Sequence, residues 1–477
     1  MKKIKVLMVM IMGVISINTN AQNLVLWGTC CFGGTNGYGS IFQIDSSGNN
    51  FHIVYSFDST NGFPHDNMIQ ANNGKIYGLG GTTYGIYERD YIYEYDPIAN
   101  TATKVHDFNQ DTTNGFITWS GMIKGLDGKL YGLCDSGGMY HNGVIYSFDP
   151  NTHNYTNLFS FNDTLGGHPQ GRLLQLNNGM LYGMTFNGGA FGFGVIFSYD
   201  LTANNYMDIK NFDSTTGAKP YYSTLIQATD GKLYGMTELG GLFDGGVIFN
   251  YDVTSNIYTD IFDFDCSNSN GCRPLASLFQ ASNGKLYGFT YTGGGSLYGT
   301  IFIYDIITHT YTKRYDFDLT NGNGSNPTGS FVQAGNNLFA TVQCTNLNYG
   351  LGVAIKLKLS TGVAYIIENF ITDSCWLSAG DFLATTIDTG IPYINNNEGF
   401  NLFPNPFTSQ TTLTLQGTYH HPSLFIYNLL GQEVQNIYAG SNKQIVINRN
   451  NLPGGMYFYK LMDDDKQVIG TGKMVMW

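Results

Sequence analysis

The residues best suited to chemistry in this chain are carboxylates that stand outside its repeated pattern. Glu88 and Asp90 lie in one loop, and Glu238 lies in a corresponding loop of a later repeat. Two carboxylates that face one substrate can cleave a glycosidic bond, one as the acid and the other as base or nucleophile. A polysaccharide hydrolase or lyase is one interpretation, and a solvated loop charge is the commoner alternative. Further residues without a counterpart in most repeats are His65, Asp66, His141, His168, Arg172 and Arg273.

Other aspartates recur at one place in successive repeats, each directly after a phenylalanine. A ring of such carboxylates could bind Ca²⁺, which takes about six to eight oxygen ligands. The alternative is an Asx turn, in which the side chain caps its own backbone. We favour the turn, because an active site occurs once and these residues occur once per repeat. The sequence therefore assigns no catalytic residue, no metal ligand and no cofactor, with Ca²⁺ as the alternative. The aspartates are Asp58, Asp213, Asp265 and Asp318.

Aromatic residues in glycine-rich loops form a third group with chemical potential. Exposed rings beside glycine offer flat surfaces for a sugar ring or for a partner's side chains. The alternative for any one ring is packing over the edge of its own sheet. Because the rings are spread over most repeats, they favour a non-catalytic binding function over catalysis. The candidate binding residues are Tyr84, Tyr140, Phe191, Phe193, Phe243, Tyr298 and Tyr349.

The seven cysteines are the last reactive group. Cys266 and Cys272 bracket a short loop, and in an exported protein this spacing predicts a local disulfide. Either Cys30 or Cys31 could pair with Cys375. An odd number leaves at least one thiol within the chain unless a partner chain pairs with it.

The elements that position these residues come from a unit of about 52 residues that recurs seven times. Its clearest copies contain the motif Asx-Gly-Lys-Leu-Tyr-Gly. A repeat of this length is typical of propellers and repeat arrays. The tyrosine of the motif, or the aromatic residue that replaces it, is Trp27, Tyr77, Tyr131, Tyr182, Tyr234, Tyr287 and Phe339.

The repeat over residues 224–265 shows the elements of every copy. Asp230 and Gly231 form a two-residue hairpin turn between β-forming stretches, because both turn positions favour positive φ. A glycine loop at 240–245 and a turn at 253–256 separate two further strands. Each repeat is therefore predicted to be a four-stranded antiparallel meander, and the chain an all-β propeller of about seven blades.

The order of these elements also predicts how the ring closes and which loops share a face. The first copy starts at its second strand, so a strand at 375–379 should complete the first blade. Residues 382–385 also resemble a strand, which leaves an eighth, partial blade as the alternative. In a meander, the Asx-Gly turns lie on one face and the glycine loops lie with the inter-blade loops on the other. We call the second face the top face and expect function there, since loops on a rigid frame carry most binding sites.

Composition limits the class of protein and of partner. The chain has 477 residues, 61 glycines and a net charge of −12, and only 12% of its residues are charged. A nucleic-acid partner is excluded, because it requires clustered Lys and Arg. Three lysines, an apolar run and small residues before position 22 predict a signal peptide over 1–21. No stretch is long and apolar enough to predict an integral membrane segment.

The C-terminal part of the chain departs from the repeats after a polar linker at 388–398. Alternating apolar residues between turn signals predict a small Ig-like β-sandwich over 399–477. This segment closely resembles the type A C-terminal sorting domain of the type IX secretion system of Bacteroidota. The resemblance implies export across the outer membrane, the secretion machinery as a partner, and a surface-attached or released product. The residues that carry it are Pro404, Asn405, Pro406, Gly431, Gly454, Gly455, Tyr457 and Lys473.

The repeats in turn resemble the Gloeobacter/Verrucomicrobia repeat family. The resemblance rests on Gly-Lys-Leu-Tyr-Gly-Met-Thr at 231–237, Gly240-Gly241 and Gly-Val-Ile-Phe at 246–249. It covers roughly 24–387 and implies the architecture without an established activity. We therefore expect a propeller over 22–387 that is secreted or held at the cell surface. It would bind a glycan or a protein through its top-face loops, with a hydrolase or lyase in the top-face funnel as the alternative.

Overall fold

The computed structural model shows an all-β protein, with one short 3-10 helix, η1 (Asp163–Leu165), among its described elements. The chain divides into two compact units, of which one is Leu24–Thr385 and the other contains Thr386–Trp477. Among the described residues, no helix combines the length and apolar character needed to cross a membrane. The structure describes residues 24–45, 50–81, 90–108, 114–118, 121–318, 324–342, 352–369, 375–377, 382–386, 400–403, 407–415, 422–428, 433–438, 444–450, 452–462 and 468–476.

The larger unit consists mainly of four-stranded antiparallel sheets that follow one another along the chain. The second strand of each repeat contains the anchor aromatic residue and lies in the interior of its sheet. These second strands are β1 (Leu24–Gly33), β5 (Ile76–Gly81), β10 (Leu130–Cys134), β15 (Leu181–Met184), β19 (Leu233–Thr237), β23 (Leu286–Thr290) and β27 (Asn337–Val342). The third strands are β2 (Ser40–Asp45), β6 (Asp90–Asp96), β12 (Val144–Phe148), β16 (Val195–Asp200), β20 (Val247–Asp252), β24 (Thr300–Asp305) and β28 (Val353–Lys358).

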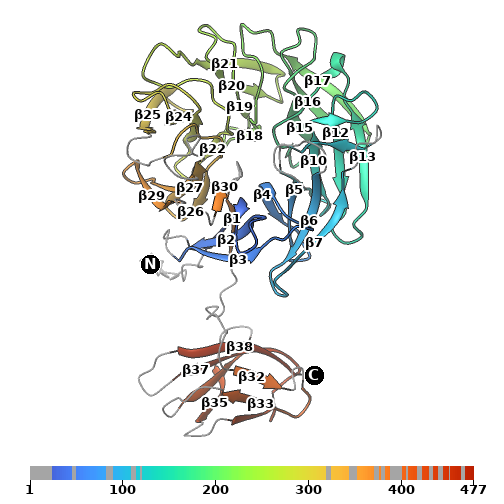
Figure 1. Cartoon of the computed structure of the whole chain (residues 1–477), viewed down its shortest axis with the longest axis vertical. Helices are drawn as coiled ribbons and strands as arrows, with labels where there is room; N and C mark the ends of the chain where they lie inside the picture. The colour runs from blue at the N-terminus through green and yellow to red at the C-terminus, as the bar shows by residue number, and fades with distance from the viewer. Residues whose placement is uncertain are drawn as a thin grey trace, which may run out of the picture. The chain divides into compact units, whose positions relative to one another are not determined.

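The first and fourth strands form the two edges of each sheet. In Figure 1, β18, β22 and β4 lie nearest the middle of the ring, and β21, β25 and β7 lie at its periphery. The first strands are β4 (Pro64–Gln70), β9 (Ile123–Lys124), β14 (Leu174–Gln175), β18 (Ile226–Gln227), β22 (Phe279–Gln280) and β26 (Val332–Ala334). The fourth strands are β3 (His52–Ser56), β7 (Thr101–Asp107), β13 (Tyr155–Ser160), β17 (Asn205–Asn211), β21 (Ile257–Asp263), β25 (Thr310–Asp316) and β29 (Val363–Asn369).

The repeated motif is explained by contacts within each sheet. In the β19 copy, the carboxylate of Asp230 accepts hydrogen bonds from the backbone of Lys232 (3.1 Å) and from the hydroxyl of Tyr234 (2.8 Å). The turn is thereby fixed to the buried anchor ring. Gly235 lies under the ring of Phe249 in the next strand, where a Cβ atom would be only 2.5 Å from Cζ. The motif therefore requires an Asx residue, an aromatic residue and a glycine in that order.

Two series of hydrogen bonds join neighbouring sheets near their first strands in the described residues. One series uses hydroxyls: the backbone N–H of Thr224 donates to Ser277 Oγ, and that of Ser277 donates to Ser330 Oγ. The other uses glutamines, as where the N–H of Thr229 donates to Gln280 Oε1 at 2.8 Å. Because each bond spans about one repeat, adjacent sheets are held in a fixed register.

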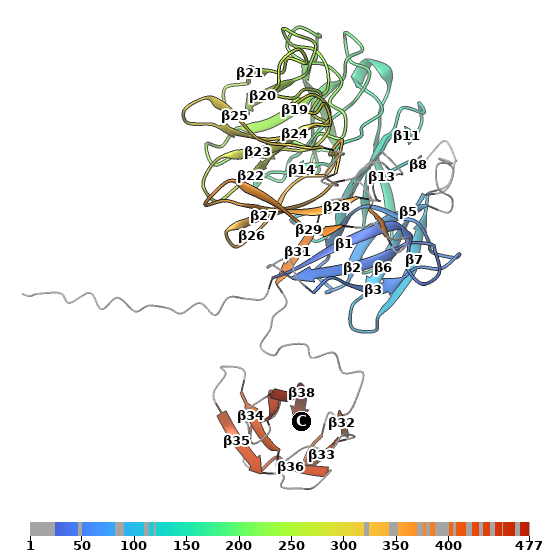
Figure 2. The same ribbon diagram turned by 60° about the vertical axis from the view of Figure 1, so that its left-hand side comes forward.

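The first sheet is completed by strands from the end of the larger unit. β30 (Cys375–Leu377) pairs with β1, and β31 (Leu383–Thr386) pairs with β1 as well (Figure 2). The indole of Trp27 also donates to Thr385 Oγ1 at 2.8 Å. The predicted closing strand is therefore present. The second predicted strand joins the same sheet, so the alternative of an additional partial blade has no sheet of its own in the described part of the chain.

The smaller unit contains two sheets that share an apolar core. One sheet has the order β32 (Phe400–Phe403), β33 (Gln410–Leu415) and β36 (Gln444–Asn448). The other has the order β35 (Glu433–Tyr438), β34 (Ser423–Tyr427), β37 (Gly455–Met462) and β38 (Val468–Met476).

The residues of the predicted sorting motifs fall in different parts of this unit. Gly454 and Gly455 lie at the start of β37, where the hydroxyl of buried Tyr457 donates to the carbonyl of Pro453 at 2.8 Å. Lys473 lies in β38. Outside the described residues lie Pro404, Asn405, Pro406 and Gly431.

Candidate functional site

The glycine loops and the inter-blade loops pair with each other, which places them on one face. Isolated antiparallel bridges join Gly167 to Asn187, Ala218 to Leu239, and Cys272 to Thr292. The short strands β8 (Gly115–Phe116) and β11 (Ser136–Gly137) make the same connection in another repeat. The top face expected from the strand order is therefore a continuous framework of backbone hydrogen bonds.

One position of the inter-blade loops is fixed by backbone hydrogen bonds, which lie on both sides of it at Phe63, His168, Lys219 and Arg273. The N–H of Lys219 donates to the carbonyl of Phe193 in the preceding repeat (2.9 Å), and its own carbonyl accepts from the N–H of Glu238 in the following repeat (3.0 Å). All equivalent described residues have positive φ, an uncommon conformation for residues other than glycine. We call them the clamp residues: Phe63, Ile117, His168, Lys219, Arg273 and Asn326.

His168 is the clamp residue with the most ordered polar surroundings. Its Nδ1 lies 3.1 Å from Oδ2 of the buried Asp135, and this hydrogen bond raises the pKa of His168. Asp135 also accepts from Gln170 Nε2 at 2.8 Å and from Ser136 Oγ at 2.8 Å. An aspartate that orients a histidine in this way can support proton transfer or hydrogen bonding to a ligand.

Lys219 forms a second polar group with residues of the preceding and following repeats. Its Nζ lies 4.7 Å from the centre of the Phe186 ring and donates to Asn187 Oδ1. Burial lowers the pKa of Lys219. Burial also raises the pKa of Glu238, while the charges of Arg273 and Lys219 act in the opposite direction. Burial outweighs the two cations, so the pKa of the half-buried Glu238 lies above its usual value.

The loop that follows Lys219 contains one residue more than its counterparts. Arg172, Thr224, Ser277 and Ser330 are equivalent, because hydrogen bonds join each to the next around the ring. Three of them lie three residues after the proline of their loop, at 169, 274 and 327, whereas Thr224 lies four residues after the proline at 220. The insertion brings Tyr221 and Tyr222 together, with ring centres 4.2 Å apart.

The inserted loop forms part of an aromatic cluster. Tyr222 has φ of 52°, and the hydroxyl of Tyr221 lies 3.3 Å from that of Tyr222. The ring of Tyr221 also meets the edge of Phe186, with centres 5.2 Å apart. All three rings are half-buried. Together with Lys219 and Glu238, they make the junction between the β16 and β20 sheets unlike the others.

A separate group of apolar side chains occupies the tips of the glycine loops. Side chains of the fourth strands fix the backbone of these tips. For example, the N–H of Leu242 donates to Oδ1 of Asp263 in β21 (2.6 Å). The N–H of Ala190 donates in the same way to Oδ1 of Asn211 (2.6 Å). We call this group the crest. Its members are at least 50% exposed: Met139, Tyr140, Phe191, Leu242, Phe243 and Leu297.

The candidate binding residues from the sequence are therefore only partly brought together. Tyr140, Phe191 and Phe243 belong to the crest. Phe193 and Tyr298 do not, because each lies next to the last glycine of its loop, forms a bridge to the first glycine and packs against an apolar core. Tyr84 and Tyr349 lie outside the described residues. Met139, Leu242 and Leu297 were not foreseen, since the prediction considered aromatic residues alone.

The carboxylates considered for catalysis do not form a described pair. Glu88 lies outside the described residues, and Asp90 accepts hydrogen bonds from the backbone N–H (2.5 Å) and Oγ1 (3.0 Å) of Thr118. Burial opposes ionisation of Asp90, but hydrogen bonds from His65 and Thr118 outweigh it and lower its pKa. Asp90 thus joins two loops, and Glu238 lies among cations.

The recurring aspartates cap their own loops. Oδ1 of Asp58 accepts from the N–H of Thr60 at 2.8 Å, and Oδ1 of Asp265 accepts from the N–H of Ser267 at 2.8 Å. These hydrogen bonds lower the pKa of both aspartates. Within the described ranges, no group of three or more His, Cys, Asp or Glu residues could hold a metal ion. Asp58 and Asp265 therefore have the Asx-turn geometry favoured above.

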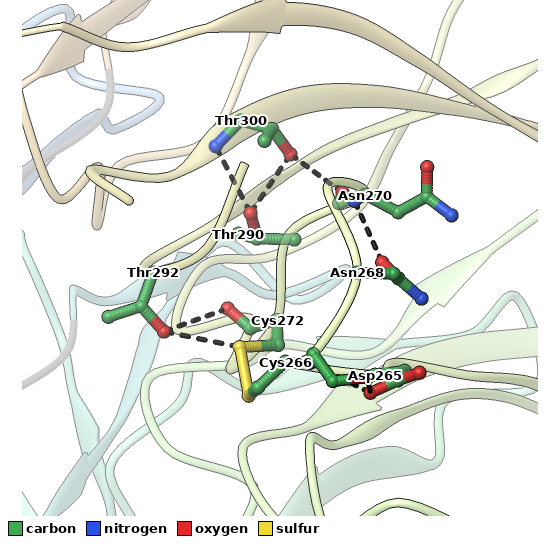
Figure 3. Close-up of a disulfide and its surroundings, with 9 residues drawn as sticks. Asp265, Cys266, Asn268, Asn270, Cys272, Thr290, Thr292 and Thr300 are labelled. Carbon is green, nitrogen blue, oxygen red and sulfur yellow. Dashed lines mark hydrogen bonds between the residues drawn. A yellow bond between two sulfur atoms is a disulfide. The ribbon is translucent and has the colours of Figure 1, made fainter. Parts of the chain in front are cut away.

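A disulfide in one loop of the top face lies next to a clamp residue in the sequence. Cys266 and Cys272 form a disulfide, and Arg273 follows directly (Figure 3). The backbone of Cys272 exchanges hydrogen bonds with that of Thr292, and the hydroxyls of Thr290 and Thr300 lie 2.9 Å apart nearby. This loop is therefore covalently closed next to Arg273.

The other cysteines differ in state. Cys30 is disulfide-bonded, and its partner's side chain lies outside the described residues. Cys31 and Cys134 are thiols. Burial raises the pKa of both thiols, for Cys31 to about 12. A thiol with such a high pKa is a poor nucleophile at neutral pH, because the thiolate is the reactive form.

Solved structures with a similar fold include enzymes. The periplasmic gluconolactonase of Pseudomonas aeruginosa is 13% identical, with a TM-score of 0.52, over 76% of this chain and 99% of the other. A putative 6-phosphogluconolactonase of Bacteroides fragilis is 14% identical, with a TM-score of 0.50, over 77% and 99%. At such low identity the similarity shows a propeller-like fold alone.

A third similar structure comes from a secretion system. PorZ, a surface component of the type IX secretion system of Porphyromonas gingivalis, is 15% identical, with a TM-score of 0.45. The match covers 93% of this chain, which spans 63% of the length of PorZ. No curated protein is significantly similar to the chain.

Family comparisons account for both units. Residues 401–476 match the secretion system C-terminal sorting domain, which implies export by the type IX secretion system. Residues 18–229 and 209–385 match the Gloeobacter/Verrucomicrobia repeat and together cover most of the chain. The protein belongs to the Gloeobacter/Verrucomicrobia repeat family.

Proposed function

We propose that this protein is an exported, non-catalytic binding protein whose top-face loops recognise a glycan or a protein ligand. The observation that carries the proposal is the set of clamp residues. The same pair of backbone hydrogen bonds recurs at Phe63, His168, Lys219 and Arg273, whose side chains are of four different types. A constant frame with different side chains suits recognition, because loops on a rigid scaffold carry specificity.

The crest supports the same proposal. Its side chains are large, apolar and exposed on successive repeats, and the hydrogen bonds from the fourth strands fix the loops below them. Preorganised apolar residues lose little conformational entropy on binding. The crest thus supplies contact area at low entropic cost, and the clamp residues supply polar selectivity.

The proposed layout follows the sequence predictions. A signal peptide at 1–21 directs the chain to the periplasm, and residues 22–387 form a propeller of seven blades. A linker at 388–398 joins it to an Ig-like sorting domain at 399–477, which directs the protein to the secretion machinery. The product is a secreted or surface-held protein of a Bacteroidota cell.

The test is ligand screening with the mature full chain against a glycan array and against extracts of surface proteins. A double variant, Tyr140→Ala with Phe243→Ala, removes two crest rings and should weaken binding by about tenfold or more. The matched control is Ile98→Ala with Ile307→Ala, which removes side chains that are 88% and 83% exposed in turns between the third and fourth strands. Loss of binding in the control alone would assign function to the opposite face.

A polysaccharide hydrolase or lyase is the second candidate function, and the Asp135–His168 pair is the observation that favours it. An ordered, partly exposed histidine can act as a general base. Activity of the mature chain on a polysaccharide, lost in His168→Asn, would establish catalysis. If wild type and His168→Asn show equal release of reducing or unsaturated ends, the pair has no catalytic role.

A further inference from the structure

We propose that the inserted residue after Pro220 creates a carbohydrate-binding subsite, in which a pyranose ring packs on Tyr221 and Tyr222. This inference rests on the proposed binding function of the top face and narrows its ligand to a glycan. It adds a contact at the junction between the β16 and β20 sheets to the contacts that the crest supplies.

The insertion is local and breaks the symmetry of the ring. The stretch between the proline and the residue equivalent to Thr224 is Gln170-Gly171 before Arg172, Leu275-Ala276 before Ser277 and Thr328-Gly329 before Ser330. Aromatic residues occupy it only in the Tyr221-Tyr222 copy among these four. A specific ligand site is expected to break the symmetry of the repeats, and this feature does so among the four copies compared.

The backbone of the inserted residue supports a role beyond packing. Tyr222 has φ of 52°, a left-handed conformation that is unfavourable for a bulky residue. On both sides of the insertion the frame is unchanged, because the N–H of Glu238 still donates to Lys219 and the N–H of Thr224 still donates to Ser277 Oγ. The extra residue is therefore accommodated in one short loop, which presents two tyrosines side by side.

The groups beside the rings suit a carbohydrate better than an apolar peptide side chain. Lys219 carries an ammonium over the Phe186 ring, and Asn187 lies within hydrogen-bonding distance of it. Glu238 and the exposed Arg273 add a carboxylate and a guanidinium. Sugar hydroxyls both donate and accept, so a mixed set of donors and acceptors beside an aromatic surface matches them.

The crest provides the contrast. Its described side chains are Met, Tyr, Phe and Leu, and the tips of these loops carry few charges. Such a surface suits another protein, whereas the Tyr221-Tyr222 cluster combines half-buried rings with charged groups. The two surfaces can therefore be tested separately.

The experiment is affinity electrophoresis of the mature full chain in gels that contain one soluble polysaccharide each: laminarin, xylan, mannan, polygalacturonate or alginate. Deletion of Tyr222 restores the loop length of the other repeats, and Tyr221→Leu introduces the residue found at the equivalent position 275. Both variants should bind the retained polysaccharide about tenfold more weakly or worse, as expected for loss of a central aromatic contact. Ile307→Ala, in an exposed turn between β24 and β25 on the opposite face, should bind within about twofold of wild type.

Three results would overturn the proposal. The first is equal binding by wild type and Tyr221→Leu, which remains decisive if the deletion variant does not fold. The second is retention by none of the five polysaccharides while a protein ligand binds through the crest, which would leave the proposed function intact. The third is that no glycan and no protein binds the mature chain. That result would contradict both the carbohydrate-binding subsite and the proposed binding function. Thermal unfolding of each variant shows whether the fold is retained.

Discussion

The backbone N–H of Thr224 donates a hydrogen bond to Oγ of Ser277 over 2.9 Å, although 53 residues separate them in the chain. Both residues are buried. The same contact joins Arg172 to Thr224 and Ser277 to Ser330, so a single hydroxyl per repeat ties neighbouring sheets together.

Replacing Ser277 by alanine tests how much the hydrogen bonds between neighbouring sheets contribute to stability. The substitution leaves the N–H of Thr224 buried without an acceptor, which costs about 1 to 3 kcal/mol of unfolding free energy. Urea denaturation measures the change. The control Ser296→Ala, in a glycine loop, should alter stability by less than about 0.5 kcal/mol. Equal stability of both variants would mean that water replaces the hydroxyl.

Gly235→Ala tests the packing of the repeated motif. The new Cβ would lie 2.5 Å from Cζ of the buried Phe249 and 3.0 Å from Cδ2 of Leu225, so the sheet must shift. We expect a loss of at least about 2 kcal/mol. The control is Gly295→Ala, whose Cβ would meet nothing closer than 3.6 Å. If Gly235→Ala unfolds at the same urea concentration as wild type, the close contact is relieved cheaply.

Asp260 is a predicted source of pH-dependent stability. Its Oδ1 is buried and has no hydrogen-bond partner in the described structure. Burial, assisted by the charge of Asp263, raises the pKa of Asp260 from 3.8 to about 6. The native state therefore binds more protons than the unfolded state between these values, so stability should fall as pH rises from about 4 to about 6, by roughly 1 to 3 kcal/mol.

Two other repeats indicate which substitution at Asp260 would remove this loss of stability with rising pH. At the equivalent place they have lysine, with Lys104 2.7 Å from Asp107 and Lys313 2.8 Å from Asp316. Asp260→Lys should form the same pair with Asp263, stabilise the protein at pH 7 by about 1 kcal/mol or more, and abolish the decline between pH 4 and 6. Asp260→Asn should abolish the decline with a smaller gain. A decline that persists in both variants would assign it to another group.

The disulfide between Cys266 and Cys272 should stabilise the top face through the unfolded state. The two residues are six positions apart, and the entropy of closing so small a loop corresponds to about 2 kcal/mol. The double variant Cys266→Ser with Cys272→Ser should lose about this amount in calorimetry under oxidising conditions. Reduced wild type should match the double variant, and a difference between them would point to the other disulfide.

Removal of the C-terminal unit tests the export route. Residues 401–476 match the sorting domain, and the chain divides into two compact units. A chain that ends at Asn395 should keep a folded propeller but accumulate in the periplasm. Cell fractionation with immunoblotting measures this. Normal amounts of the truncated chain at the surface or in the medium would show that the segment is not the export signal.

Much of the fold could be predicted because contacts within each repeat determine its local structure. Asp230 bonds the anchor Tyr234, and Gly235 makes room for Phe249, so each motif specifies a turn and two strands locally. Ring closure depends instead on pairing between β1 and β30, where no local pattern sets the register. The sequence could suggest the closing strand but not that β31 would join the same sheet.

The candidate site was predictable only where a residue differed in type from its counterparts. His168, Glu238 and Arg273 stood out for that reason. Tyr221 and Tyr222 were missed, although counting residues from Pro220 to the equivalent strand position would have revealed the insertion. Exposure within a glycine loop was not readable either, because a shift of two positions separates exposed Phe191 from half-buried Phe193.

Closure of the first sheet also determines when the second edge of β1 can pair during synthesis of the chain. β1 leaves the ribosome near the beginning of synthesis, yet Trp27 meets its partner Thr385 only after 358 further residues. Until then β1 presents an unpaired edge, which is prone to aggregation and to capture by other chains. A chain truncated before β30 would keep that edge permanently. Because β30 and β31 precede the sorting domain in the sequence, the strands that cover the edge of β1 are always synthesised before the sorting domain.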